Sequence, residues 1–237
     1  IVRDLTCVNF WNDGFNLHGG TGPIWFENIV GNWNGDEGFS AHENAECYVR
    51  GGEFSNNYWH GINDIIFSRT HFVDVVCRDN RSKGVRFNGG SHSLTDCEIS
   101  GSPINVELLH HSVTEFPMAE HHPLANSFTN LRNTVVRSGD DEVGIFVGPN
   151  SDTVVEHCLL EGGVPVVQVE AEGNAFVVNS VITGGSGPQI VAAGEYIADH
   201  NLYSPGVFSI AGTEFGPDAF AQYREATGND ANSLIGE

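Results

Sequence analysis

A glycine recurs at an almost constant interval in the first half of the chain, each time followed by an apolar residue. The four glycines, Gly14, Gly38, Gly61 and Gly84, are separated by 24, 23 and 23 residues. A repeating unit of this length is too short to bury a hydrophobic face alone, so it must stack on its neighbours in a solenoid. Stacking would bring residues about 23 positions apart side by side.

The residues between the glycines indicate the kind of solenoid. They form short runs of alternating apolar and polar residues, such as 71–77 and 174–179, separated by Gly, Asn and Asp. This alternation is typical of β-strands, whereas helical repeats have their own periodicity. Each unit therefore predicts one coil of a parallel β-helix, and later, less regular units bring the count to about nine coils.

Two further columns accompany the glycines. Seven residues before them, an internal apolar column would hold Cys7, Phe54 and Cys77, and Val30 joins it if the second coil carries one inserted residue. Five residues before them, a turn column would hold Asn9, Asn56 and Asp79, with Asn32 joining under the same insertion. Stacked amides at a turn can hydrogen-bond from coil to coil, so the second column predicts an asparagine ladder.

Segments 35–42 (GDEGFSAH) and 220–230 (FAQYREATGND) are similar to parts of secreted bacterial β-helix repeat proteins. As an architecture, nearly the whole chain resembles the right-handed parallel β-helix superfamily of pectate lyases and related lyases, epimerases and glycosidases. The resemblance implies an all-β fold, a right-handed, single-stranded parallel β-helix over residues 1–215 with a C-terminal cap and tail at 216–237. It also implies an extracellular or periplasmic protein.

Both ends of the chain carry expectations. A short helix at about 217–227 would cover the last coil and protect its exposed edge. The chain begins inside a strand with no capping element before it, which indicates that an N-terminal part is missing. We therefore expect a monomer or part of a longer chain.

Charge and cysteine content exclude several classes. A formal charge of -21 disfavours nucleic acid or an anionic membrane as a partner. The sequence contains no run of 18 apolar residues, so we do not expect it to insert into a membrane. The five cysteines include no CxxC pair, and Cys7, Cys77, Cys97 and Cys158 fall at internal positions. We expect all five to be unpaired and those in the core to be inert.

The strand after each glycine predicts an outward patch. Phe15, Phe39, Ile62 and Val85 should face inward, which turns their neighbours outward. Three outward columns follow: Asn16, Ser40, Asn63, Arg86 and Asn105; then His18, His42, Asn88 and Glu107; then Asp13, Glu37, His60 and Lys83. Because coils are roughly 4.8 Å apart, the columns would form a patch about 15 to 20 Å long, enough for an extended sugar polymer.

Basic residues gather near this patch. Five of the ten lie within one coil and its approach, namely Arg69, Arg78, Arg81, Lys83 and Arg86, and Lys83 is the only lysine. A local positive spot on an acidic protein suits a carboxylate or sulfate ligand. The alternative is that these cations only offset neighbouring acids.

Histidines and carboxylates also converge on the patch. His18, His42 and His60 suit proton transfer near neutral pH, particularly beside carboxylates that orient the imidazole. Alternatively, Asp36, Glu37 and Asp64 could hold calcium, which takes six to eight oxygen ligands.

A long loop at 109–126 should flank the patch, because the interval between the runs at Ile104 and Gly144 grows to about 40 residues. Loops of this length are usually functional or disordered. Two His-His pairs within it, with Glu115 and Glu120, are a weaker candidate for a transition-metal site.

The leading functional hypothesis is a protein that acts on or binds an acidic polysaccharide, as a lyase working by β-elimination or as an epimerase. The resemblance to polysaccharide lyases implies that Arg86 or Lys83 is the base and His60 a proton donor or second base, with His42 and Glu37 also catalytic. Substrate contacts would come from Asn16, His18, Ser40, Asn63, Arg78, Arg81, Asn88, Asn105 and Glu107. Two alternatives remain open: a non-catalytic binding or structural module, and a glycoside hydrolase that uses Asp36, Glu37 and Asp64.

Overall fold

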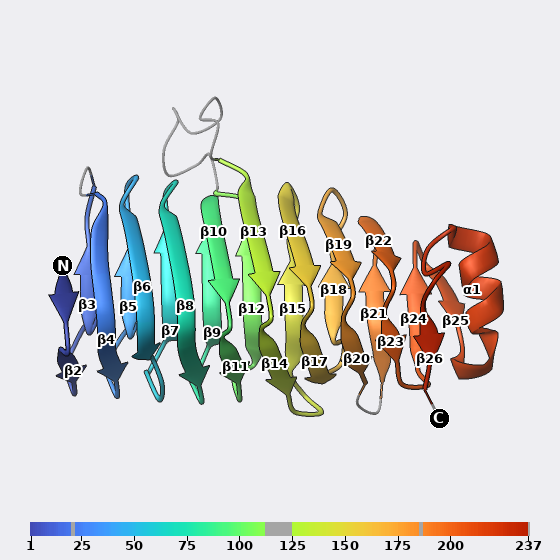
Figure 1. Cartoon of the computed structure of the whole chain (residues 1–237), viewed down its shortest axis with the longest axis horizontal. Helices are drawn as coiled ribbons and strands as arrows, with labels where there is room; N and C mark the ends of the chain where they lie inside the picture. Colours follow the sequence, from blue (N-terminus) through green and yellow to red (C-terminus); the bar gives the residue numbers. More distant parts are fainter. Residues whose placement is uncertain (20–21, 112–124, 185–186, 237) are drawn as a thin grey trace.

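The computed structural model describes residues 1–19, 22–111, 125–184 and 187–236. They form an all-β parallel solenoid of about eight turns, one fewer than predicted, with a short helix at the C-terminal end (Figure 1). The coils stack in a single row, and the two termini lie at opposite ends of it. The predicted parallel β-helix is therefore confirmed.

The strands form two sheets. The ten-stranded sheet carries the strands that follow the glycines. Its members are β3 (Phe15–Leu17), β5 (Phe39–Ala41), β7 (His60–Ile65), β9 (Lys83–Asn88), β12 (Ile104–Leu109), β15 (Val143–Val147), β18 (Val167–Val169), β21 (Pro188–Ala192), β24 (Val207–Ile210) and β25 (Thr213–Phe215). Only the pairing of β24 with β25 is antiparallel among the described strands of this sheet.

The sixteen-stranded sheet covers the other sides of the solenoid. Its first members are β1 (Val2–Arg3), β2 (Thr6–Val8), β4 (Ile24–Asn32), β6 (Glu46–Glu53), β8 (Arg69–Arg78), β10 (Gly90–Thr95), β11 (Glu98–Ser100) and β13 (Ser127–Arg132). It continues with β14 (Val135–Ser138), β16 (Ser151–Glu156), β17 (Leu159–Gly162), β19 (Asn174–Val178), β20 (Val181–Thr183), β22 (Glu195–Asp199), β23 (Leu202–Tyr203) and β26 (Leu234–Ile235).

A bend divides this larger sheet into two faces. The bend holds one residue with positive φ at each of nine stacked positions, and all nine are Asn, Asp, His or Gly: Asp4, Asn28, Gly51, Asp74, Asp96, Asn133, His157, Asn179 and His200. These residue types are the ones that tolerate the left-handed region best. The strands β4, β6 and β8 run through the bend, whereas later coils use two separate strands.

The predicted interior column is confirmed. Phe15 pairs with Phe39, Phe39 with Ile62 and Ile62 with Val85, and all four side chains are buried. The column continues through Val106, Ile145, Val167, Ile190 and Phe208. Burial of this apolar ladder along the whole solenoid is the main source of its stability.

The inserted residue expected in the second coil is absent. Cys7 pairs with Gly31, while Val30 pairs with Thr6 and Glu53. Glycine fits this interior position because a Cβ on Gly31 would lie 3.1 Å from the ring of Phe54 and 2.4 Å from the carbonyl oxygen of Gly38. The large ring of Phe54 therefore fills space that Val30 was expected to occupy.

The asparagine ladder lies one residue later than predicted. The backbone N–H of Asn34 donates to Asn57 Oδ1, and that of Asn57 donates to Asn80 Oδ1, each at 2.9 Å. The predicted column of Asn9, Asn56 and Asp79 has positive φ instead, and Trp33 occupies its place in the second coil. Asn is favoured at the first position because it tolerates a positive φ, and at the second because its amide bonds to the next coil. The presence of Asn therefore could not show which of the two positions forms the ladder.

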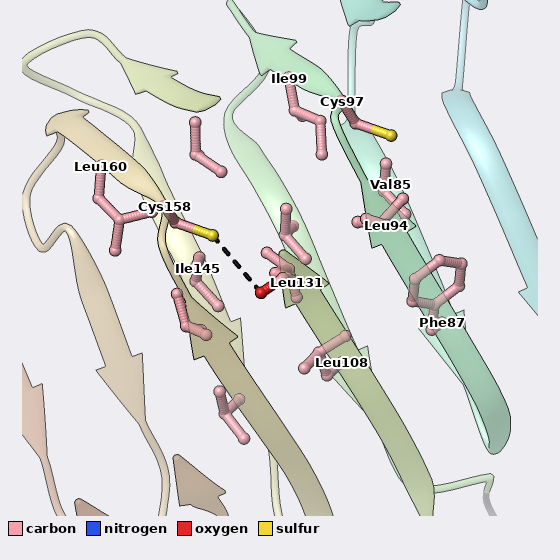
Figure 2. Close-up of a cluster of buried hydrophobic side chains, with 14 of the residues drawn as sticks. Val85, Phe87, Leu94, Cys97, Ile99, Leu108, Leu131, Ile145, Cys158 and Leu160 are labelled. Carbon is pink, nitrogen blue, oxygen red and sulfur yellow. Dashed lines mark hydrogen bonds between the residues drawn. The ribbon is translucent and has the colours of Figure 1, made fainter. Parts of the chain in front are cut away.

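All five cysteines are free, as predicted, and only Cys7 is not fully buried. Cys97 and Cys158 lie among Leu and Ile side chains inside the coil, where the Cys158 thiol donates to the carbonyl oxygen of Leu131 at 3.5 Å (Figure 2). Burial raises the pKa of Cys97 to about 12 and that of Cys158 to about 11. Because the thiolate is the reactive form, these two side chains act as small hydrophobes.

The predicted C-terminal cap is also confirmed. A short 3₁₀ turn at Pro217–Ala219 leads into α1 (Phe220–Thr227), which lies against the last coil (Figure 1). The buried ring of Tyr223 stacks on Phe208 with centroids 4.6 Å apart. Its hydroxyl donates at 2.7 Å to Asp230, a fully buried carboxylate.

Candidate functional site

The outward side chains of β3, β5, β7, β9 and β12 form one polar surface, which we call the outer face. Strand register sets its columns. Asn16, Ser40, Asn63, Arg86 and Glu107 follow one another on neighbouring strands, as do His60 and Lys83. Most of the predicted patch is thus brought together, but two of its members are placed differently.

Glu107 takes the place that was expected for Asn105, and Asn105 is buried. Glu107 pairs with Arg86 and so belongs to the Asn16 column, not to the column of His18, His42 and Asn88. Asn105 is fully buried near the start of β12, where its amide donates to Arg137 O at 3.0 Å and accepts from the Ser102 N–H at 3.1 Å. The register of this coil was misjudged because the glycine series ends at Gly84, so no glycine marks where the next coil begins.

Three carboxyl groups meet at the start of the outer face. Asp13, Asp36 and Glu37 each offer an oxygen within 4.8 Å of the others. Burial, followed by the charges and hydrogen bonds of Asp13 and Asp36, raises the pKa of Glu37 to about 9. Burial and the charge of Asp13 also raise the pKa of Asp36. Glu37 is therefore protonated at neutral pH, and Asn63 Nδ2 donates to its Oε1 at 3.1 Å.

His60 lies in the coil next to Glu37. The backbone N–H of Gly38 donates to His60 O at 3.1 Å, which fixes the two coils in register. The imidazole is 2 % exposed, and neither ring nitrogen has a hydrogen-bond partner among the described residues. Burial, together with the charges of Arg86 and Lys83, lowers the pKa of His60 to about 3. The ring is uncharged at neutral pH.

Two cations share one carboxylate on the following coils. Lys83 Nζ lies 3.2 Å from Glu107 Oε1, and Arg86 Nε lies 3.1 Å from Glu107 Oε2. All three side chains are largely buried, with 21 %, 28 % and 11 % of their surface exposed. Two positive charges against one negative charge leave this spot with a net positive charge, although the whole chain carries -21.

The histidine column forms the edge of the outer face. The rings of His18 and His42 stack with centroids 4.8 Å apart, and Ser40 Oγ lies 2.5 Å from His42 Nε2. Burial and the neighbouring His18 lower the pKa of His42. Asn16 is exposed and donates to Asp13, while Asn88 lies on the outer strand position two coils beyond His42.

Arg78 and Arg81 are not part of this surface. Arg78 ends β8 on the larger sheet, and Arg81 lies in the following turn, over the ring of Tyr58 at 4.8 Å. Arg69, at the other end of β8, is exposed as well. The five cations that are close in sequence are distributed around one coil, and of these five only Lys83 and Arg86 lie on the outer face.

Asp64, predicted as a metal ligand, lies inside the coil. Its column holds Ala41 and Phe87, and its side chain is fully buried. There the Thr70 hydroxyl bridges Asp64 and His92 Nδ1, 2.8 Å from the latter, and His92 Nε2 lies 3.1 Å from Gly89 O. Of the predicted calcium ligands, Asp36 and Glu37 lie together with Asp13, and Asp64 belongs to a separate interior network.

This interior network predicts a pH dependence of stability. Burial raises the pKa of Asp64 to about 8 and lowers that of His92 to about 3, so the folded pair holds one proton up to about pH 8. Unfolded, the two groups lose their protons near pH 3.9 and 6.5. Above pH 6.5 the folded chain therefore holds more protons, and stability falls as pH rises, by about 1 to 1.5 kcal/mol between pH 6.5 and 8.

The substitution Asp64→Asn should remove this loss, because an amide can keep the Thr70 hydrogen bond without titrating. Urea unfolding at pH 6.5, 7 and 8 measures the change. Glu37, whose pKa is also raised, to about 9, contributes a loss of the same sign, but it is present in both proteins, so the difference between their slopes reports Asp64. Equal slopes for Asp64→Asn and the unsubstituted protein would contradict the prediction.

The predicted loop at 109–126 lies largely outside the described residues, which end at His111 and resume at Ala125. Of its histidines, His110 Nδ1 lies 3.2 Å from Asn126 Oδ1, and His111 is buried. The histidine pair at 121–122 and both glutamates of the proposed metal site fall in the undescribed part.

Sequence reasoning did not identify a set of aromatic residues at the turns beside the outer face. Trp11, Tyr58 and Trp59 line a hollow of about 560 Å³ together with Asp36, one of the clustered acids. A sequence signal existed: three of the four tryptophans fall in turns, where Gly, Asn and Asp are usual.

No protein-family model, curated protein or solved structure matches the chain. None of the helices in the described ranges is long and apolar enough to cross a membrane.

Proposed function

We propose that the chain binds an anionic polysaccharide across the outer face and cleaves it by β-elimination, as an extracellular lyase. One observation carries the proposal: Glu37 and His60, in neighbouring coils, have pKa values displaced in opposite directions, to about 9 and about 3. A protonated carboxyl beside an uncharged imidazole is the arrangement that acid and base catalysis require. Structural ion pairs also perturb pKa values, but among the described residues neither Glu37 nor His60 belongs to an ion pair.

Lys83 and Arg86 would bind the uronate carboxylate. Both are already paired with Glu107, so they suit charge neutralisation better than removal of a proton, the role first considered for them. A bound carboxylate would also offset the positive charges that lower the His60 pKa. Substrate binding would thus make His60 a stronger base, at the moment when a base is needed.

The reaction then divides between two side chains. His60 takes the proton on the carbon next to the carboxylate, a carbon–carbon double bond forms, and the bond to the leaving glycosidic oxygen breaks. Glu37 gives its proton to that oxygen, and water returns a proton from His60 to Glu37. An epimerase would share the first step but would return a proton to the carbon.

The hydrolase alternative has weaker support. Two catalytic carboxyl groups usually stand about 5 to 5.5 Å apart for retention and 6.5 to 9.5 Å apart for inversion. The oxygens of Asp13, Asp36 and Glu37 lie within 4.8 Å of one another, and Asp64 lies inside the coil. A calcium ion bridging the three clustered acids to the polymer is the alternative to direct pairing with cations, since calcium favours carboxylate oxygens.

The decisive experiment is a screen of the purified protein against uronate and sulfated polysaccharides. Unsaturated, ultraviolet-absorbing products with new reducing ends support the lyase, and reducing ends alone indicate a hydrolase. Binding without either product indicates a non-catalytic module. Chelation that abolishes binding would favour a bridging cation over Lys83 and Arg86.

Arg86→Ala should weaken binding of the polymer by about 1.5 to 3 kcal/mol, the usual value of a hydrogen bond to a charged group. Added salt should weaken the remaining binding, because the interaction is electrostatic. Arg78→Ala is the matched control, since it removes the same charge from a side chain outside the outer face. Equal affinities for the two variants in calorimetry would place the binding surface elsewhere.

A further inference from the structure

Exposed aromatic side chains line the turns that lead into the first coils of the outer face. Phe10, Trp11, Trp33, Tyr58 and Trp59 keep between 48 % and 96 % of their surface exposed. They line two adjoining hollows of about 520 and 560 Å³, which share Trp11, Gly35 and Tyr58. Leaving so much aromatic surface in water is unfavourable, so such a patch usually marks a binding site.

The three shared residues border both hollows, and we call the space between Trp11 and Tyr58 the aromatic slot. Trp11, Gly35 and Tyr58 lie on three successive coils, because the Gly35 N–H donates to Phe10 O at 2.7 Å and the Tyr58 N–H donates to Asn34 O at 2.9 Å. Gly35 adds no side chain between the rings. A Cβ there would lie 2.1 Å from the carbonyl oxygen of Trp11, so the backbone itself requires glycine and keeps the slot open.

The width of the slot indicates what fits. Trp11 and Tyr58 are two coil steps apart, roughly 10 Å between backbones. A flat ring held between two others needs about 3.5 to 4.0 Å on each side, so it would leave space unfilled. A sugar ring in its chair form is thicker and presents C–H groups to both aromatic faces. It also carries hydroxyl groups along its edge.

The surroundings of the slot suit those hydroxyl groups. Asn12 and Asp36 line one hollow, and Asn56 and Asp79 line the other. The guanidinium of Arg81 lies 4.8 Å from the centre of the Tyr58 ring, a cation–π contact that stabilises the position of the ring. Aromatic walls with a few polar groups are the usual composition of a small-molecule site. Asp36 also belongs to the acid cluster, so the slot continues directly into the outer face.

We infer that the aromatic slot binds one sugar ring of the polysaccharide, outside the unit that reacts on the outer face. The inference rests on the proposed function for the identity of the polymer. It does not rest on cleavage, because Trp11 and Tyr58 touch none of the groups assigned to proton transfer. The slot would hold the chain by stacking, whereas Lys83 and Arg86 would hold it by charge.

The two kinds of contact can be separated with chemically altered probes. Polygalacturonate and alginate are compared with the same two polymers after reduction of their carboxyl groups, which removes the pairing with Lys83 and Arg86 but leaves sugar rings that can stack. Calorimetry measures binding of all four. Trp11→Ala should weaken binding of the reduced polymers about tenfold or more, while Trp25→Ala, an exposed tryptophan on the larger sheet, should leave it unchanged.

Three results would overturn the inference. The first is that Trp11→Ala and Tyr58→Ala bind the polymers with the affinity of the unsubstituted protein. The second is that none of the four polymers binds, and the third is that Trp11→Ala changes the sedimentation coefficient. The last result would show that the slot meets another protein copy. Binding that depends on Trp11 without any cleavage would remove the proposed β-elimination and leave the slot intact.

Discussion

Replacing His60 by glutamine should slow cleavage of the polymer by roughly 100- to 10,000-fold, the usual contribution of a positioned general base. Binding should be kept, because Lys83 and Arg86 stay paired with Glu107 on the neighbouring coils. The imidazole has no hydrogen-bond partner among the described residues, so its loss breaks no network. A drop in turnover without a drop in affinity is therefore the expected result.

The pH profile distinguishes a base from a merely structural residue. A base must be deprotonated and an acid protonated, so kcat/KM should fall below the His60 pKa of about 3 and above the Glu37 pKa of about 9. Between these limits the profile should be flat. His60→Gln should lose the acid limb, and Asn88→Ala, on the same face but away from the two groups, should keep both. Loss of binding in His60→Gln, or unchanged turnover, would contradict the assignment.

The interior of the solenoid was predictable because glycine spacing and strand alternation act on every coil in the same way. Phe15, Phe39, Ile62 and Val85 stack as expected, since a period-2 strand leaves no other face for them. The cap was predictable for a similar reason: Phe220 and Tyr223 are spaced as one face of a short helix. Local patterns decide such features.

The details that failed depend on space between coils. Gly31 takes the place expected for Val30 because the ring of Phe54 needs the volume, and neither residue shows this locally. Asn105 was expected on the outer face, but it is buried near the start of β12 and donates to Arg137 O, 32 positions away. Sequence spacing gives the order of coils more readily than the exact register between them.

The sequence predicted which residues belong to the candidate site better than it predicted their charges and ion pairs. The columns identified Glu37, His60, Lys83 and Arg86, but not that Glu107 pairs with both cations or that Glu37 is protonated. Burial is the main cause of the displaced pKa values of Glu37 and His60. The alternation of apolar and polar residues does not show that an outward side chain is buried. Asp64 failed for a different reason: it lies two residues after the inward Ile62, so alternation places it inside the coil, whereas the calcium hypothesis took it for an outward ligand.

Asp230→Ala should destabilise the C-terminal end of the solenoid by roughly 2 to 6 kcal/mol. The carboxylate accepts from the hydroxyls of Tyr223 at 2.7 Å, Ser233 at 2.5 Å and Tyr203 at 3.1 Å. Tyr203 keeps a contact with the Tyr196 hydroxyl, but the other two buried hydroxyls would lose the acceptors shown here. Each orphaned buried donor costs about 1 to 3 kcal/mol.

Hydrogen exchange is the suitable measurement, because all four tryptophans lie within the first 59 residues and their fluorescence does not report on the cap. In a solenoid each coil is stabilised mainly by its neighbours, so amide protection should fall first in β22, β23 and β24 and persist in β4 to β8. Asp230→Asn is the matched control. It keeps an acceptor and tolerates the positive φ of 55° at this position, so it should cost less than half as much. Protection in β22 to β24 equal to that of the unsubstituted protein would show that the packing of Tyr223 on Phe208 holds the cap without the carboxylate.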